Sequence, residues 1–346
     1  MEFPLAHIPF ALEPYLIALG FAAGVCGGLW GMGGGWIIIP ALQAIGTEVH
    51  VAIGTSVAQI LGNSLISSLR HWGFGNVSLR LVLVMVPGQF LGIEIGVRIL
   101  EHFKHLGPRH TDVFIGVVYV ALLAVLAAFI VIEVFRTLRR RPEATKPAVT
   151  GDARTPDHVG AGLACRVQAL RLYPCISCKV SDIRSISVWV VLATGIAMGV
   201  TTGLLGVGGG LLGMPVLVYV IGCPTPVAVG TSVASTICSA LLGTFRHAMH
   251  ANVDLPLALS LLAGASLGVQ FGAFATRYVR GVVIRGLFAV MATMAALSVV
   301  LNVFYGMRQT ALWVVAGTLL AISVTIMVLL VSAVRAEAHM RSSNSP

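Results

Sequence analysis

Charged residues are scarce in this chain of 346 residues, where Asp, Glu, Lys and Arg fill only 10% of the positions. Soluble domains carry about 25% charged residues, so this sequence has too few of them to cover a surface that faces water. Hydrophobic residues fill 57% of the positions, and the mean hydropathy is +0.93. Continuous apolar runs of ~20 residues, without the alternation of barrel strands, predict an all-α fold, a polytopic transmembrane helical bundle.

Motifs of several other protein classes are missing. There is no HExxH pattern and no paired His in the apolar runs, so we expect no metalloenzyme and no cofactor. Trp36 and Leu211 follow the two glycine runs, where a nucleotide-binding P-loop would need Lys and then Ser or Thr. The net charge of +9 fits Lys and Arg in cytoplasmic loops, so we expect no nucleic-acid partner. The first residues lack a basic region, so we expect no cleaved signal peptide.

The six cysteines do not form a recognisable metal motif. Cys165, Cys175 and Cys178 lie in the polar middle of the chain, but a structural zinc site needs a fourth ligand, and His158 is the one candidate nearby. The remaining cysteines lie in or beside apolar segments, where a free thiol behaves as a small hydrophobic group. We therefore expect no metal site.

Glycine is abundant instead, and its pattern occurs twice. GGLWGMGGGWIIIP (27–40) and GLLGVGGGLLGMP (203–215) interrupt long apolar stretches, and VAIGTSVA (51–58) and VAVGTSVA (227–234) follow them. Arg-His and then Asn-Val come next in both copies. These matches predict two homologous transmembrane repeats, 14–135 and 187–305. A basic cytoplasmic linker, 136–186, with a short hairpin would join them, and an additional helix, 310–334, would follow.

The distribution of arginines indicates how the repeats are oriented. If the linker is cytoplasmic and the segment 187–222 crosses the membrane once, Arg277, Arg280 and Arg285 fall outside the cell. If the glycines make that segment double back, these arginines return to the cytoplasm, as the positive-inside rule prefers. Each repeat then makes an odd number of crossings, and the two repeats are expected to be inverted.

The glycine runs are candidates for a substrate site. Irregular backbone at membrane depth is tolerated where it is buried in protein or lines a polar cavity, and free N–H groups at the start of a half-helix attract anions. Hydroxyl and amide side chains after each run could add hydrogen bonds. Glycines spaced by four, such as Gly88 and Gly92, are better explained by close helix packing. The predicted substrate-binding residues are Gly33, Gly34, Gly35, Thr55, Ser56, Gln59, Asn63, Gly208, Gly209, Gly210, Thr231 and Ser232.

Few ionisable groups lie within the predicted spans. Glu94 is the main one, and Gln270 occupies the matching position of the second repeat. An intramembrane carboxylate suggests a functional role, here a proton site. The Arg-His pairs at the ends of the GTS helices suit helix C-termini. The candidates for a proton or charge role are Glu94, Arg70, His71, Arg246 and His247.

The paired GxxGxGGGxxxxP motifs, each followed by VAxGTS and then by Arg-His, resemble those of the TauE/SafE sulfite exporter family. The resemblance covers both repeats and leaves out the linker and the last helix. It implies a secondary active transporter in the bacterial inner membrane that moves a small sulfur-containing anion such as sulfite, sulfoacetate or another organosulfonate. It also implies coupling to an ion gradient, H⁺ or Na⁺, and no ATP hydrolysis.

Three alternatives stay open. A carrier for another small anion, such as a carboxylate, or for a nucleobase would differ only in substrate. A passive anion channel would require a continuous ring of similar residues around the pore, and two unequal repeats do not readily form one. An integral-membrane enzyme would need a metal or nucleophile inside the spans. The residues do not indicate the direction of transport or the oligomeric state.

Overall fold

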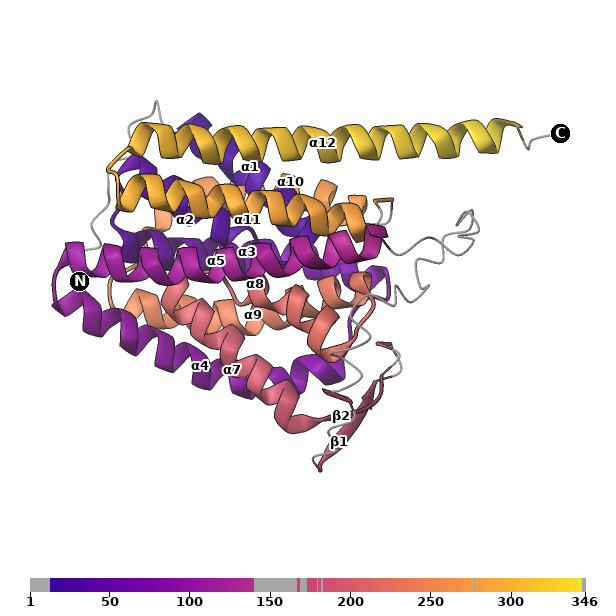
Figure 1. Cartoon of the computed structure of the whole chain (residues 1–346), viewed down its shortest axis with the longest axis horizontal. Coiled ribbons are helices and arrows are strands. Elements are labelled where there is room, and N and C mark those ends of the chain that lie inside the picture. Colours follow the sequence, from indigo (N-terminus) through magenta and orange to yellow (C-terminus); the bar gives the residue numbers. More distant parts are fainter. Residues whose placement is uncertain are drawn as a thin grey trace.

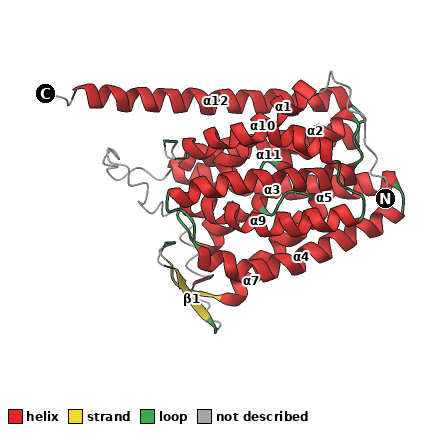
Figure 2. Ribbon diagram, turned by 180° about the vertical axis from the view of Figure 1, so that it is seen from behind, coloured by secondary structure: helices red, strands yellow, loops and turns green. Residues whose placement is uncertain are grey.

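A computed structural model describes residues 13–139, 167–168, 173–178, 180–181, 183–276, 278–279 and 281–343. Helices dominate it, in agreement with the predicted all-α class, and Figures 1 and 2 show them from opposite sides. In chain order the elements are α1 (Glu13–Trp30), α2 (Gly35–Ile45), α3 (Val49–Gly73), α4 (Leu79–His105), α5 (Pro108–Arg139), β1 (Cys175–Cys178), β2 (Ile183–Ser187), α7 (Val188–Leu205), α8 (Gly210–Pro215), the π-helix η1 (Val216–Ile221), α9 (Thr225–Met249), α10 (Leu255–Ala275), α11 (Gly281–Val303) and α12 (Arg308–Ser343).

Among the described residues, nine helices are long and apolar enough to cross a membrane. The protein is therefore a multi-pass membrane protein, a polytopic helical bundle. The predicted additional helix corresponds to α12, which lies along one edge of the bundle (Figure 1). Most of the predicted linker lies outside the described residues, but β1 and β2 pair as an antiparallel hairpin within it. Its cytoplasmic location stays a prediction.

Glycines let two pairs of helices approach backbone to backbone. A Cβ atom added to Gly24 of α1 would lie 2.6 Å from the carbonyl oxygen of Ala265 in α10. One added to Gly92 of α4 would lie 2.2 Å from the carbonyl oxygen of Ile196 in α7. Such contacts are impossible for any residue with a side chain, so these glycines serve packing, as their spacing predicts. Each pair joins a helix of one predicted repeat to a helix of the other.

Both close pairs are parallel. Gly20 and Gly28 of α1 lie against Leu261 and Val269 of α10, in the same order. Along α4 and α7 the contacts run from Gly88 with Leu192 to Gly96 with Val200. The helices α1 and α10 therefore start at one end of the bundle, and α4 and α7 start together as well.

Side-chain contacts at the loops identify the two ends of the bundle. At one end, called the Lys104 end, Lys104 of α4 donates a 2.6 Å hydrogen bond to Asn252, just before α10, and interacts electrostatically with His50, which follows α2. At the other, the Ser78 end, the N–H of Ser78 before α4 donates to Thr231 Oγ1 near the start of α9. The segment α1–α2 thus starts and finishes at the Lys104 end, and α7–η1 starts and finishes at the Ser78 end.

The two broken segments consequently open in opposite directions. The helices between them, α3 and α9, pack on each other in the middle of the bundle, and α5 packs on α11 (Figure 2). The duplication of the sequence stays a prediction. The opposite directions of the two segments favour its inverted form.

Candidate functional site

Two glycine segments interrupt the helices in the interior of the bundle. The first glycine segment, residues 31–35, separates α1 from α2, and the second glycine segment, residues 206–210, separates α7 from α8. Gly33 and Gly34 have φ of 70° and 83°, and Gly208 and Gly209 have φ of 69° and 71°. Residues with a side chain rarely adopt these angles, so the local sequence determines where each helix breaks.

The two segments lie next to each other, with α3 contributing the side chain between them. Cβ atoms added to Gly33 and Gly208 would lie 2.6 Å and 2.7 Å from the same atom, Cγ2 of Ile60. One added to Gly210 would lie 2.4 Å from Cα of Met32, so the segments also touch directly. The structure therefore brings the two predicted halves of the site together in one fully buried region.

The backbone amides of both segments are available as donors. In the described part of the chain, the N–H groups of residues 33–35 and 208–210 donate to no protein acceptor. Each set lies at the start of a half-helix, where the helix dipole adds positive potential. This chemistry suits a small anion.

Serine hydroxyls cross from each GTS motif to the opposite glycine segment. Ser56 Oγ of α3 donates to the carbonyl oxygen of Gly206 at 3.1 Å, and Ser232 Oγ of α9 donates to that of Gly31 at 3.2 Å. These bonds satisfy carbonyl groups that the helix breaks leave open. The two serines therefore lie at the segments, where the sequence analysis places them.

The neighbouring threonines have a different environment. Thr55 Oγ1 accepts a hydrogen bond from the N–H of Asp254 at 2.9 Å, and Thr231 Oγ1 accepts one from the N–H of Ser78 at 3.0 Å. Each hydroxyl thus holds the loop before α10 or α4, and its own O–H remains able to donate. Their role as substrate ligands stays a prediction.

The amide side chains of α3 make the two sides of the site unequal. Asn63 Nδ2 donates to the carbonyl oxygen of Gly33 at 2.8 Å, whereas the matching residue of α9, Ser239, makes a 3.4 Å contact with that of Gly208. Asn63 Oδ1 and both polar atoms of Gln59 are buried without a partner. A buried amide group without a partner costs roughly 1–3 kcal/mol, so these atoms are suited to bind a polar ligand or water.

The predicted charged residues pair between helices, and among the described residues they make no hydrogen bond with the glycine segments. Glu94 accepts hydrogen bonds from Arg246 Nη2 at 3.0 Å and from Arg98 Nε at 2.8 Å. In the matching pair, Arg70 donates to the neutral Gln270 at 2.6 Å. These contacts favour a charge role for Glu94 that fastens α9 to α4.

The histidines that follow these arginines are fully buried. His71 lies against the backbone of Gly28 near the end of α1, and His247 lies against that of Gly203 near the end of α7. Their ring nitrogens have no hydrogen-bond partner of good geometry. A proton role stays a prediction for both.

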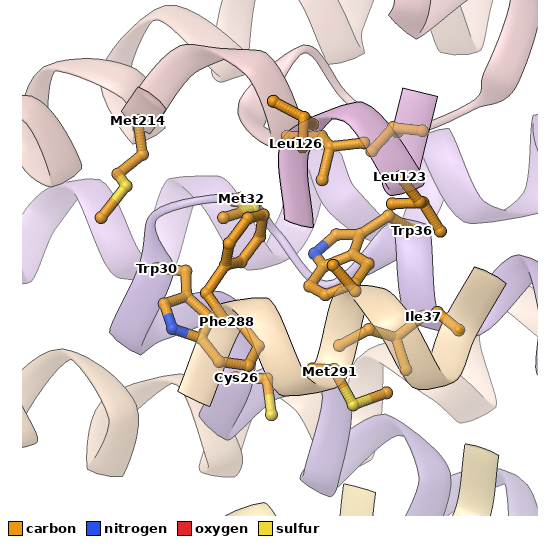
Figure 3. Close-up of a cluster of buried hydrophobic side chains, with 14 of the residues drawn as sticks. Cys26, Trp30, Met32, Trp36, Ile37, Leu123, Leu126, Met214, Phe288 and Met291 are labelled. Atoms are coloured by element: carbon orange, nitrogen blue, oxygen red, sulfur yellow. The ribbon is translucent and has the colours of Figure 1, made fainter. Parts of the chain in front are cut away.

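Aromatic side chains pack beside the first glycine segment (Figure 3). Trp30 and Trp36, on either side of the segment, lie 5.7 Å apart between ring centres, and each packs on Phe288 of α11. Trp30 Nε1 donates to the carbonyl oxygen of Ile284 at 2.9 Å, and the Tyr119 hydroxyl donates to that of Trp36. The first segment is thereby fixed between α5 and α11. The matching residues of the second segment are Leu205 and Leu211.

The described cysteines and carboxylates do not gather into a metal site. Among the described residues, no three His, Cys, Asp or Glu side chains lie close enough together to hold an ion, and Cys165 lies outside those residues. Cys223, in the short connection between η1 and α9, is buried beside Ser181, and burial raises the pKa of its thiol to about 12. This thiol is therefore protonated at neutral pH.

Sequence reasoning missed Ile60 and Met32. Ile60 follows Gln59 and lies one turn after Ser56 and about one turn before Asn63, so helical periodicity could have placed it on the same face. An apolar residue in a polar stripe gave no reason to select it. For Met32, no signal in the sequence shows which residue of the other segment it meets.

The chain matches the model of the family described as "Sulfite exporter TauE/SafE" over residues 16–299. The "Probable membrane transporter protein YunE" of Bacillus subtilis is 28% identical to it, over 76% of this chain and 88% of that protein. A "Probable membrane transporter protein" of Xylella fastidiosa is 27% identical, over 75% and 82%. No solved structure matches the chain significantly. Because the family model spans most of the sequence, the chain belongs to the TauE/SafE sulfite exporter family of membrane transporters.

Proposed function

We propose that this protein is a secondary active transporter that moves a small sulfur-containing anion, such as sulfite, sulfoacetate or a related organosulfonate, across the bacterial inner membrane. The anion is held between the two glycine segments. One observation carries this proposal. The backbone N–H groups of residues 33–35 and 208–210 have no described protein acceptor, and the two segments lie next to each other in one buried region. Donors at two half-helix starts can share the three oxygens of a sulfonate.

Side chains of α3 and α9 complete the proposed site. Gln59 and Asn63 supply amide groups, and Ser56 and Ser232 exchange their bonds to glycine carbonyls for bonds to the substrate. Ile60 fills the space between the segments, so it must turn aside when substrate binds. The charge of Arg246 is balanced by Glu94, which leaves the positive potential of the site to the backbone.

Transport is coupled to an H⁺ or Na⁺ gradient in this proposal. Carbonyl groups at the end of a broken helix are the usual cation partners in such carriers. His71 and His247 lie near the carbonyl ends of α1 and α7 and are the candidate proton groups. A carboxylate carrier and a passive anion channel are the rival proposals, and substrate selectivity and dependence on a gradient separate them.

A thermal-shift panel on detergent-purified protein tests the site. It compares sulfite, sulfoacetate, sulfate, acetate and chloride on the unchanged protein, on Gln59→Leu and on Ser235→Ala. Gln59 has no protein partner to lose, so Gln59→Leu should fold normally. Ser235 occupies the matching position of α9 and donates to its own helix, so Ser235→Ala is the matched control.

We expect a sulfur oxyanion to raise the melting temperature of the unchanged protein and of Ser235→Ala, and to have little effect on Gln59→Leu. Acetate acting in place of the sulfur oxyanions would favour the carboxylate carrier. If Gln59→Leu responds as strongly as the unchanged protein, the site is not between the glycine segments.

A further inference from the structure

The buried polar face of α3 continues beyond the glycine segments. Ser64, Ser67 and His71 are 1%, 2% and 0% exposed, and helical periodicity puts them on the face that also carries Ser56 and Asn63. From Ser56 to His71 this face runs from the glycine segments towards the Ser78 end of the bundle. The distance corresponds to about four turns of helix, so the polar face connects the candidate site with one end of the protein.

The hydroxyl groups on this part of α3 have no partners. Neither Ser64 Oγ nor Ser67 Oγ has a hydrogen-bond partner. A helical serine can donate to the carbonyl group a turn before it, and Ser235 and Ser239 of α9 do so. Ser235 Oγ donates to the carbonyl oxygen of Ser232 at 2.9 Å, and Ser239 Oγ contacts that of Thr236 at 3.1 Å. The two α3 hydroxyls make no such bond to their own helix.

Two of the three corresponding positions of α9 are apolar, and the third, His247, matches His71. Ala240 and Gly243 stand where α3 has Ser64 and Ser67. Ala240 is fully buried in a cluster with Val57 and Ile60, and a Cβ atom added to Gly243 would lie 3.0 Å from Val57 Cγ1. Hydrocarbon therefore fills α9 at these two positions, and the buried polar atoms of α9 without a partner resume at Thr244 and His247.

Helix packing does not explain the serines of α3. Close approach needs a small residue, and alanine or glycine provides that without a polar group, as α9 shows. A buried hydroxyl without a partner costs roughly 1–3 kcal/mol. Two such hydroxyls on one face are explained if water or a polar solute reaches them in another state of the protein.

We propose that the face of α3 formed by Ser64, Ser67 and His71 lines the hydrophilic path between the glycine segments and the Ser78 end, and that α9 lines no equivalent path. Substrate and water pass along α3 on this side of the membrane. The proposal rests on the proposed function for the identity of the cargo, but not for the existence of the path. Passage on the Lys104 side must use other surfaces.

Single cysteines test the path. Ser64→Cys, Ser67→Cys and the matched control Ala240→Cys are made in the otherwise unchanged chain and treated with a negatively charged, membrane-impermeant methanethiosulfonate. The reagent is applied to intact cells and, separately, to inverted membrane vesicles. Mass spectrometry of peptides identifies each labelled position, so the native cysteines can stay. Melting temperatures check that each variant is folded, and Ser67→Thr replaces Ser67→Cys if the latter unfolds, with transport rate as its readout.

We expect the introduced thiols of Ser64→Cys and Ser67→Cys to be labelled from one membrane face only, and that of Ala240→Cys from neither. Ser67→Thr, which narrows the path, should slow transport without lowering the melting temperature. Equal labelling of Ala240→Cys, or no labelling of either serine variant, would overturn the proposal. If the serine variants are labelled but no added sulfur oxyanion slows the labelling, the path stands and the proposed cargo is contradicted.

Discussion

Gly210→Ala should force the two glycine segments apart. Gly210 is the first residue of α8 and is helical, so alanine there meets no backbone strain. The obstacle is steric, because the new Cβ atom would lie 2.4 Å from Cα and 3.0 Å from the carbonyl carbon of Met32. Both are backbone atoms of the first segment, so no side-chain rotation can relieve the contact.

The size of the effect follows from these distances. Carbon atoms prefer separations of about 3.5–4.0 Å, so the segments must move apart by ~1 Å. Overpacking of this kind costs about 1–3 kcal/mol, and the better helix propensity of alanine returns at most about 1 kcal/mol. We therefore expect the free energy of unfolding to fall by ~1–2 kcal/mol. Because the N–H groups move too, the response to substrate should weaken further.

Thermal unfolding in detergent, with and without a sulfur oxyanion, measures both effects. Gly286→Ala is the control, because it lies within α11 and a Cβ atom there would meet nothing within 4 Å. The free energy of unfolding of Gly286→Ala should rise by up to ~1 kcal/mol, because alanine has the better helix propensity, and the response to substrate should be unchanged. If Gly210→Ala melts like the control and binds substrate normally, the two segments are not in the close contact described.

Three further changes have clear expected outcomes. Glu94→Gln reproduces the pairing of Arg70 with the neutral Gln270 in the other predicted repeat, so Arg246 should keep a hydrogen-bond partner. We expect thermal unfolding to show a stability loss of about 1 kcal/mol or less, and uptake assays to show that transport is retained. A complete loss of coupled transport would instead make Glu94 a proton site. Asn63→Ala leaves the Gly33 carbonyl group without its donor, and should cost roughly 1–3 kcal/mol in thermal unfolding; an unchanged melting temperature would contradict this. Ile60→Ala removes the side chain between the segments and should cost about 2–5 kcal/mol, with larger sulfonates stabilising the variant more than the unchanged protein; equal ligand responses would place the site elsewhere.

The sequence predicts the all-α class and the GTS helices well, because both depend on local patterns. Consecutive glycines such as Gly33 to Gly35 allow a helix to end at that position, and the long apolar runs define the membrane spans. The pairing of helices is beyond such reasoning. Nothing in the Gly24 or Gly92 spacing identifies α10 and α7 as partners, since small residues permit a close approach without specifying the neighbour.

Part of the candidate site is equally hidden. The GTS motif suggests hydroxyl groups near a site, but it does not show that Ser56 and Ser232 reach the glycine segment of the opposite half. Nor does it show that Thr55 and Thr231 turn to the loops before α10 and α4. Adjacent residues of a helix point about 100° apart, so a motif of two hydroxyls necessarily serves two different neighbours. Which neighbour each one meets is decided by packing.

Helices of one predicted repeat pack closely on helices of the other, and this limits which parts of the protein can move relative to each other during transport. The simplest form of alternating access rocks two repeats against each other around a fixed site. However, α1 is joined to α10, and α4 to α7, by backbone contacts of glycines such as Gly28 and Gly96 that leave no room for sliding. Each close pair therefore contains one helix of each predicted repeat, α1 with α10 and α4 with α7. The helices α3 and α9 lie between the two pairs, and their mutual contact adjoins the glycine segments. Motion there would separate Ile60 from Gly208 and open the polar face of α3, so binding and the opening of the proposed path would be consequences of one displacement.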